Sequence, residues 1–226
     1  VQRLMQALES GPVLPDGSLG MHGVEALLRF LPDLSRELPG ETVGSERIYE
    51  GQIVNLRRDT VRMSEGHEAM REVVEHPGAV VVLAYDDEGR IPFVRQWRVP
   101  VGGALLELPA GGIDPGEEPA AAAARELQEE VGLKPGSLDQ VAAFWAAPGW
   151  ADEYLYGYVA RDCTASQLPP DADEKLEVHR HTLGEAMELV EQGVIADSKS
   201  ILLLQHSALR AAGPLVNKIV RHYRGE

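Results

Sequence analysis

Short apolar runs separated by turn residues recur from residue 46 to residue 181 and predict a series of β-strands. The clearest run, Ala79–Tyr85, is apolar throughout, which is typical of a strand covered on both faces. The turn at 86–89 returns the chain into Ile91–Trp97 as the partner of a hairpin. Further strands are predicted at Arg47–Tyr49, Ile53–Arg58, Ala69–Glu75, Leu105–Leu108, Val141–Ala147, Tyr154–Ala160 and Leu176–His181.

Three segments carry helix signals. Glu118–Val131 has a proline at its start, five alanines after it and a glycine directly behind it. Residues 182–185 form a capping box that opens a helix ending near Gln192. Asp197 or Ser198 caps a last helix that runs to about Ala212. Strands mixed with these helices predict an α/β or α+β sandwich.

The chain divides into four predicted parts. Residues 1–43 are rich in glycine and proline and form an N-terminal extension that we expect to be partly flexible. The N-terminal strands follow at 44–76, the main domain at 77–212 and a C-terminal tail at 213–226. The length of 226 residues is enough to bury a core without metal or disulfide staples.

The charge of the chain narrows the classes of function. The 36 acidic and 21 basic residues give a formal net charge of −15, which disfavours nucleic acid and anionic membranes as partners. A phosphorylated substrate would therefore need a divalent cation. The single Cys163 rules out an internal disulfide, and with no basic and apolar leader at the N-terminus we expect a cytoplasmic protein. His179 and His181 lack a third ligand and are expected to be structural.

The most informative segment is Gly111–Leu133. On its helix, Glu126 and Glu130 are one turn apart and Glu129 is a neighbour of Glu126, so three carboxylates crowd one side. Arg125 is placed to pair with Glu129. Oxygen ligands of this kind suit Mg²⁺ or Mn²⁺, and the preceding loop, rich in glycine and proline, lets the backbone approach a metal. The alternative is a solvated acidic helix face.

The segment matches the pattern GX5EX7REUXEEXGU, with U a bulky aliphatic residue, at every position. Seven fixed residues at roughly one in fifteen each make a chance match on the order of one in 10⁸ per starting position. The chain thus resembles the Nudix hydrolase family. The resemblance implies an α/β/α sandwich with a mixed central sheet and an N-terminal antiparallel strand region. It also implies metal-dependent hydrolysis of a nucleoside diphosphate linked to another moiety.

The same resemblance implies roles for the residues of the box. Three carboxylates and one backbone carbonyl would bind two to three Mg²⁺ or Mn²⁺ ions: Glu126, Glu129, Glu130 and Ala110. Glu117 and Arg125 would pair and brace the loop against the helix. A box glutamate such as Glu129, or else a carboxylate outside the box, would accept the proton of the attacking water.

Outside the box, the chain is similar to the ADP-ribose pyrophosphatase subfamily. Pro148 lies fifteen residues after Leu133, and the phrases at 75–80, 94–98 and 106–111 match those of the subfamily. This resemblance implies hydrolysis of ADP-ribose to AMP and ribose 5-phosphate by a homodimer whose N-terminal strands reach the partner. The alternatives are a Nudix pyrophosphatase acting on another nucleotide sugar or dinucleotide, and a Nudix module that senses ADP-ribose without cleaving it.

The subfamily resemblance adds residues to the predicted site. Glu153 is a candidate general base, with Asp152 as its substitute and an ordinary loop carboxylate as the alternative. Arg98 matches an arginine that contacts the substrate diphosphate, and its alternative is a surface cation at a strand end. The other predicted substrate-binding residues are Glu107, Trp97 and Trp150. The two tryptophans would stack on adenine or else pack in the core.

Overall fold

A computed structural model describes residues 40–63, 66–169 and 175–224 of the 226-residue chain, with side chains described as far as Gly213. The strands and the start of the last helix belong to one compact unit, residues 41–206, and the description below concerns that unit. Most of the predicted extension, residues 1–39, lies outside the described residues.

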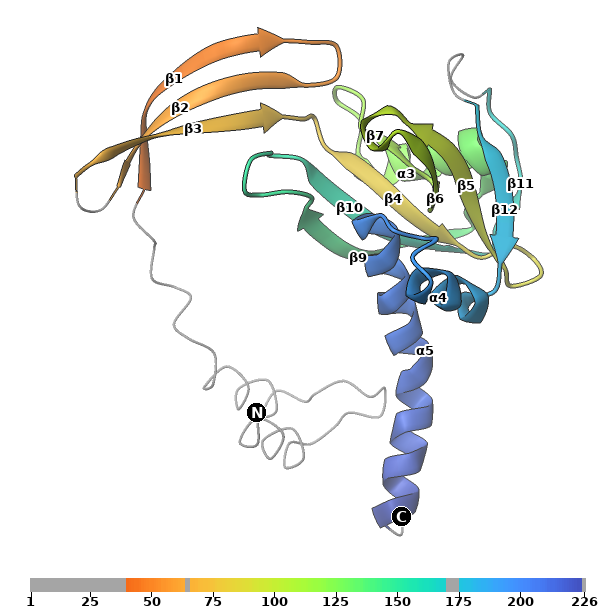
Figure 1. Ribbon diagram of the computed structural model, residues 1–226. Helices are drawn as coiled ribbons and strands as arrows, with labels where there is room; N and C mark the ends of the chain where they lie inside the picture. Colours follow the sequence, from red (N-terminus) through yellow and green to blue (C-terminus); the bar gives the residue numbers. More distant parts are fainter. Residues whose placement is uncertain (1–39, 64–65, 170–174, 225–226) are drawn as a thin grey trace. The chain divides into compact units, whose positions relative to one another are not determined.

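The first three strands form a sheet of their own (Figure 1). They are β1 (Gly40–Glu50), β2 (Asn55–Met63) and β3 (Glu68–Glu75), in the order β1-β2-β3. Strands β2 and β3 are antiparallel, with Asn55 opposite Glu75. The strand β1 begins at Gly40, earlier than the sequence predicts, and every residue of it is exposed. A strand without an apolar face gives no alternation by which its start can be recognised.

The central sheet has the order β7-β4-β10-β9. Strands β4 (Ala79–Ala84) and β10 (Tyr154–Arg161) are parallel, with Leu155 opposite Ala79. The outer strands β7 (Ala110–Gly112) and β9 (Ser137–Trp145) are antiparallel to their neighbours. The sheet is therefore mixed, as the resemblance implies.

A third sheet has the order β12-β5-β6 and is antiparallel throughout. It consists of β5 (Ile91–Arg98), β6 (Gly103–Glu107) and β12 (Glu177–His181), with the short 3-10 helix η1 (Val99–Val101) between β5 and β6. Two short strands, β8 (Leu133–Lys134) and β11 (Thr164–Ala165), pair beside the end of the helix that precedes β8.

The helices are α3 (Pro119–Val131), α4 (Leu183–Glu191) and α5 (Ser198–Arg224). The predicted capping box is present at Thr182 and Glu185. The prediction that the last helix ends near Ala212 is wrong, because α5 continues through residues 213 and 214. A Gly-Pro pair usually stops a helix, but proline removes only one intrahelical hydrogen bond and is tolerated at a cost. Within the described residues no helix has the length and hydropathy needed to cross a membrane.

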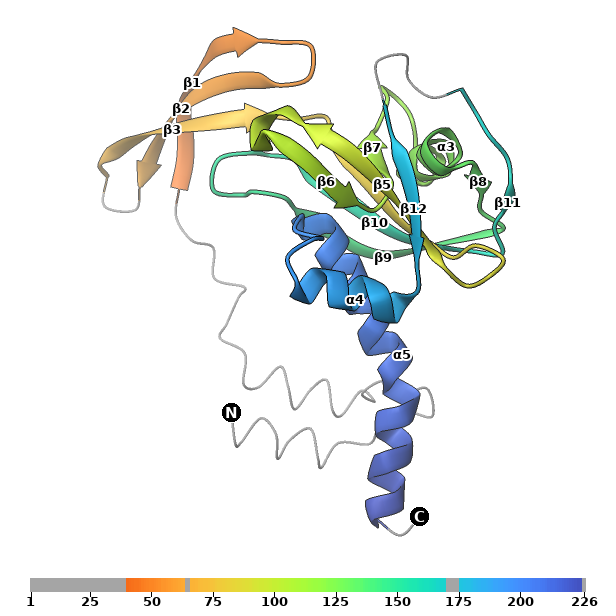
Figure 2. The ribbon, with the colours of Figure 1, turned by 45° about the vertical axis from the view of Figure 1, so that its right-hand side comes forward.

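The core explains the continuous apolar run of β4. Its even-numbered residues Val80 and Val82 pack with α3 residues such as Leu127, and its odd-numbered residues pack toward α4 and the start of α5. All six residues of β4 are buried. The central sheet lies between α3 on one face and α4 with the first turns of α5 on the other (Figures 1 and 2). The predicted α/β/α sandwich is confirmed, and it places the charged face of α3 beside β7.

Candidate active site

Helix α3 buries one face and presents the other to the loop before it. Ala123, Leu127 and Val131 recur at a spacing of four and are buried against the central sheet. Gly132 adopts the left-handed conformation, with φ 70°, and ends the helix by donating its N–H to the carbonyl of Leu127. Three residues between the buried positions contact β7: Arg125, Glu126 and Glu130. Arg125 belongs to that outward face.

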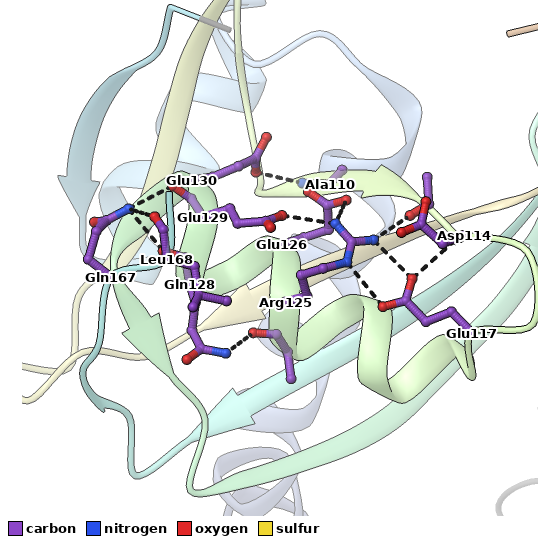
Figure 3. Close-up of polar contacts among 12 residues, drawn as sticks. Ala110, Asp114, Glu117, Arg125, Glu126, Gln128, Glu129, Glu130, Gln167 and Leu168 are labelled. Carbon is purple, nitrogen blue, oxygen red and sulfur yellow. Dashed lines mark hydrogen bonds and ion pairs between the residues drawn. The ribbon is translucent and has the colours of Figure 1, made fainter. Parts of the chain in front are cut away.

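Arg125 links three carboxylates and the backbone of β7 (Figure 3). Its Nε and Nη2 donate to the two oxygens of Glu117 at 3.0 Å each, and Nη2 also donates to the carbonyl of Gly112 at 3.0 Å. Its Nη1 donates to Glu126 at 2.7 Å and to Glu129 at 2.9 Å. These bonds raise the pKa of Arg125, chiefly through Glu117, and lower the pKa of Glu117. Both predicted pairs of Arg125, with Glu117 and with Glu129, are present.

The carboxylates of α3 lie directly against β7. A Cβ added at Gly111 would come within 2.2 Å of the Glu126 carboxylate, so that carboxylate occupies space that only glycine leaves open. Glu130, 7% exposed, accepts a hydrogen bond from the backbone N–H of Ala110 at 3.0 Å. Two carboxylates of α3 therefore contact adjacent residues of β7: Glu130 contacts Ala110, and Glu126 lies against Gly111.

This donor set fits a divalent cation by its chemistry. Carboxylate oxygens and a backbone carbonyl are the ligands that Mg²⁺ and Mn²⁺ prefer, and the Glu126 carboxylate is held against glycine backbone beside Ala110. Among the described residues, no three acidic, histidine or cysteine side chains converge closely enough to hold an ion, since Arg125 bridges Glu126 and Glu129. Arg125 thereby supplies the positive charge that the cluster of like charges requires.

A pocket of about 390 Å³ lies beside β7 and is lined in part by the residues of that strand. Its lining brings together the predicted residues Arg98, Glu107, Ala110 and Glu153, which come from four separate segments of the chain. Arg98 contacts Glu107 through both Nε and Nη2 at 2.7 Å, so it is not an unattached surface cation. The pocket therefore joins the predicted substrate-binding residues to the strand that contacts the helix carboxylates.

The loop that carries Glu153 is tied to β3. Val74 donates its N–H to the carbonyl of Trp150 at 2.8 Å, and the N–H of Asp152 donates to the carbonyl of Val74 at 3.0 Å. The Asp152 carboxylate accepts from the N–H of His76 at 2.9 Å and from Arg57 at 3.3 Å. Asp152 is thus used in holding the loop and does not line the pocket, whereas the side chain of Glu153 does.

The two predicted stacking residues lie outside this pocket. Trp97 is 62% exposed and lines a different cavity beside Arg95, and Trp150 is 59% exposed and lines a third cavity beside Asp59. The alternative that they pack in the core is therefore wrong. Neither tryptophan lines the pocket that Arg98, Glu107 and Glu153 share.

Sequence reasoning missed three polar residues of the site. Lys199 and Asp197, at the start of α5, line the pocket, and Lys199 contacts Glu107 at 2.9 Å. Gln167 donates from its Nε2 to the carbonyls of Gln128 and Glu129 at 3.1 and 2.8 Å, closing the C-terminal end of α3 (Figure 3). The sequence offers one signal for Lys199: it lies in the first turn of a predicted helix, where cations are unfavourable, so a lysine there indicates a role other than helix stability.

Comparison with known proteins identifies the family. The NUDIX domain model matches residues 75–208, and the model of the nucleoside diphosphate sugar hydrolase N-terminal domain matches residues 41–74. An ADP-ribose pyrophosphatase of Bacillus subtilis is 37% identical over 179 residues, covering 78% of this chain and 97% of that protein. An ADP-ribose pyrophosphatase of Mycobacterium tuberculosis is 42% identical over 164 residues, covering 71% and 79%.

A crystal structure of an ADP compounds hydrolase is also similar, with a TM-score of 0.69 at 25% identity, covering 79% of this chain and 98% of that one. Because the NUDIX match spans more than half of the chain, the chain belongs to the Nudix family. The prediction of a Nudix hydrolase is confirmed, and so is its likeness to the ADP-ribose pyrophosphatases.

Proposed function

We propose that this protein hydrolyses the pyrophosphate bond of ADP-ribose, adding one water to give AMP and ribose 5-phosphate. The observation that carries the proposal is that the pocket lined by Arg98 and Glu153 is also lined by β7, the strand that the α3 carboxylates Glu126 and Glu130 contact. Relatives named ADP-ribose pyrophosphatase at 37% and 42% identity support ADP-ribose as the substrate.

We propose Mg²⁺ or Mn²⁺, two to three ions, as the metal. Glu126, Glu129 and Glu130 would hold it with the carbonyl of Ala110, and this is supported by their contacts with β7 and with Arg125. A divalent cation, when bound, neutralises diphosphate charge and lowers the pKa of a bound water. It also reconciles an acidic chain with an anionic substrate.

The other proposed roles, which are substrate binding, proton transfer and support of the site, belong to side chains of the protein. Arg98 contacts the diphosphate, since a guanidinium matches phosphate oxygens and Arg98, whose side chain is 35% exposed, lines the pocket. Glu153 accepts the proton of the attacking water, supported by its place in the pocket and by the fixed loop behind it. Glu117 and Arg125 keep the β7 loop and α3 in register, so that the helix carboxylates keep their positions.

The working unit is proposed to be a homodimer built on the N-terminal strands, residues 44–76. Large apolar side chains are exposed on and beside this sheet, among them Ile48 at 45%, Tyr49 at 58% and Met70 at 54%. A partner covering this sheet would also lie near the exposed Trp150, one of the two proposed adenine-stacking residues, because Trp150 lines a cavity with residues of β2 and β3. Sedimentation analysis of the full chain is expected to give a dimer mass, and a monomer at enzyme-assay concentration would refute this assembly.

A substrate panel tests the function. The full chain is incubated with Mg²⁺ and ADP-ribose, ADP-glucose, GDP-mannose, NADH, flavin adenine dinucleotide or an oxidised deoxynucleoside triphosphate, and products are separated by chromatography. We expect the highest kcat/KM for ADP-ribose, with AMP and ribose 5-phosphate in equal amounts. Equal or greater turnover of another compound would refute the assignment of ADP-ribose. Binding of ADP-ribose without turnover would indicate a sensing module instead.

A further inference from the structure

Glu107 is a buried carboxylate that two cations share. It is 3% exposed and lies at the end of β6, where a lone negative charge would be strongly disfavoured. Arg98 occupies one of its oxygens, Oε2, at 2.7 Å, and Lys199 occupies the other, Oε1, at 2.9 Å. The two cations come from β5 and α5, which are about a hundred residues apart in the chain. The carboxylate therefore depends on both of them for its charge compensation.

Lys199 is placed where local helix preferences disfavour it. Cations are unfavourable in the first turn of a helix, whose free N–H groups are already positive. Asp197 offsets this by accepting from the N–H of Ser200 at 3.0 Å and from Lys199 at 2.9 Å. The turn is also anchored, because the N–H of Leu108 donates to the buried Ser200 hydroxyl at 2.8 Å. Residues that oppose local preference in a well-anchored element are typical of functional sites.

We propose that Lys199 is a positioning residue of this active site: by holding the Glu107 carboxylate in place, it fixes the guanidinium of Arg98 in the pocket for a diphosphate. This inference rests on the proposed function. Without Lys199, Glu107 keeps only Arg98 as its partner, and the pair is free to shift together. Recognition of the diphosphate then weakens, while the bonds that hold Glu129 to Arg125 and Glu130 to the N–H of Ala110 do not involve Lys199.

The first test compares Lys199→Met with Lys199→Arg. A methionine keeps much of the apolar length of the side chain and removes its charge, whereas arginine retains the charge. We expect Lys199→Met to raise the KM for ADP-ribose about tenfold, equivalent to about 1.4 kcal/mol, with kcat changed less than threefold, and Lys199→Arg to restore most of the KM. Lys134→Met, on the exposed residue of β8, is the matched control and should leave both constants unchanged. An unchanged KM in Lys199→Met would overturn the inference, as would a loss confined to kcat.

A double-mutant comparison separates positioning from direct contact. If Lys199 acts through Glu107, then adding Lys199→Met to Glu107→Gln should raise the KM by less than twofold beyond Glu107→Gln alone. A full tenfold further increase would mean that Lys199 contacts the substrate itself, and the positioning role would be wrong. The neutral amide introduced by Glu107→Gln also removes the unpaired charge, so the double variant remains a folded reference if Lys199→Met alone is unstable.

Calorimetry with inorganic pyrophosphate and Mg²⁺ keeps this inference distinct from the choice of substrate. Pyrophosphate offers the diphosphate without ribose or adenine, so its affinity reports on Arg98 whichever compound the enzyme cleaves. We expect about tenfold weaker binding by Lys199→Met than by the wild type, even if the substrate panel favours another compound. Equal affinities, or no binding by the wild type, would overturn the role of Lys199, and turnover of ADP-ribose would still stand on its own.

Discussion

Replacing Gly111 with alanine tests whether the place of the Glu126 carboxylate matters for the chemistry. The new Cβ would lie 2.2 Å from that carboxylate, and real Cβ contacts below 3.0 Å essentially do not occur. The obstructing atoms are the far end of a flexible side chain, so the carboxylate turns away and the backbone of β7 stays. Glu126 is thus displaced by roughly 1 Å while its charge is kept.

A shift of this size has a calculable effect. Misplacement of a reacting group by about 1 Å costs on the order of 100-fold in rate. Stability should change by less than about 1 kcal/mol, because the displaced group is a side-chain end and alanine has less entropy to lose than glycine. The assay is kcat/KM for ADP-ribose with Mg²⁺, together with thermal unfolding, where the Tm should move by less than about 4 °C.

The neighbouring glycine supplies the control. A Cβ added at Gly112 meets nothing within 4 Å, so Gly112→Ala should keep kcat/KM within threefold of the wild type. If Gly111→Ala retains full activity, the position of Glu126 is not what the reaction depends on. An equal loss in Gly112→Ala would mean that any added bulk in β7 is harmful, and the argument from the carboxylate would fail.

Two further predictions concern the support of this helix. Arg125 holds the pKa of Glu117 below its ordinary value of 4.5, so the pair stabilises the fold above that pH and loses its contribution as the pH falls through the lowered pKa. The Tm difference between the wild type and Glu117→Gln should therefore be constant near neutrality and shrink in acid, and a difference that grows in acid would contradict the pairing. Gln167→Ala removes donors from two α3 carbonyls and should lower the Tm by about 2–4 °C, a loss of about 1 kcal/mol, and an unchanged Tm would show that this cap contributes nothing.

Much of the fold is predictable because its signals are local. The strand β4 is apolar on both faces because both faces are covered. The capping box at Thr182 marks the start of α4 within four residues. The end of α5 is not predictable in the same way. Gly213 and Pro214 form the dipeptide that most strongly predicts a helix end, yet α5 continues through both residues. Local sequence preference therefore does not determine where α5 ends.

The contacts of the site likewise divide into local ones, which the sequence predicts, and contacts between distant residues, which it does not. The contact of Arg125 with Glu129 follows from a spacing of four residues on one helix, and the contact with Glu117 is expected from the resemblance to the Nudix family. The contact between Lys199 and Glu107 spans 92 residues, and that between Gln167 and Gln128 spans 39. No periodicity links such positions, since they meet only when the sheets and helices have packed.

The central claim is that the carboxylates of α3, beside this pocket, drive cleavage of a diphosphate. The most direct measurement is release of AMP from ADP-ribose in Mg²⁺ by Glu126→Gln, compared with Glu118→Gln, an exposed glutamate at the start of the same helix whose side chain makes no capping bond. We predict a loss of about a hundredfold to a thousandfold for Glu126→Gln, the range found when one group that stabilises transition-state charge is removed, with an unchanged Tm and full activity in Glu118→Gln. Turnover within tenfold of the wild type in a folded Glu126→Gln protein would contradict the account.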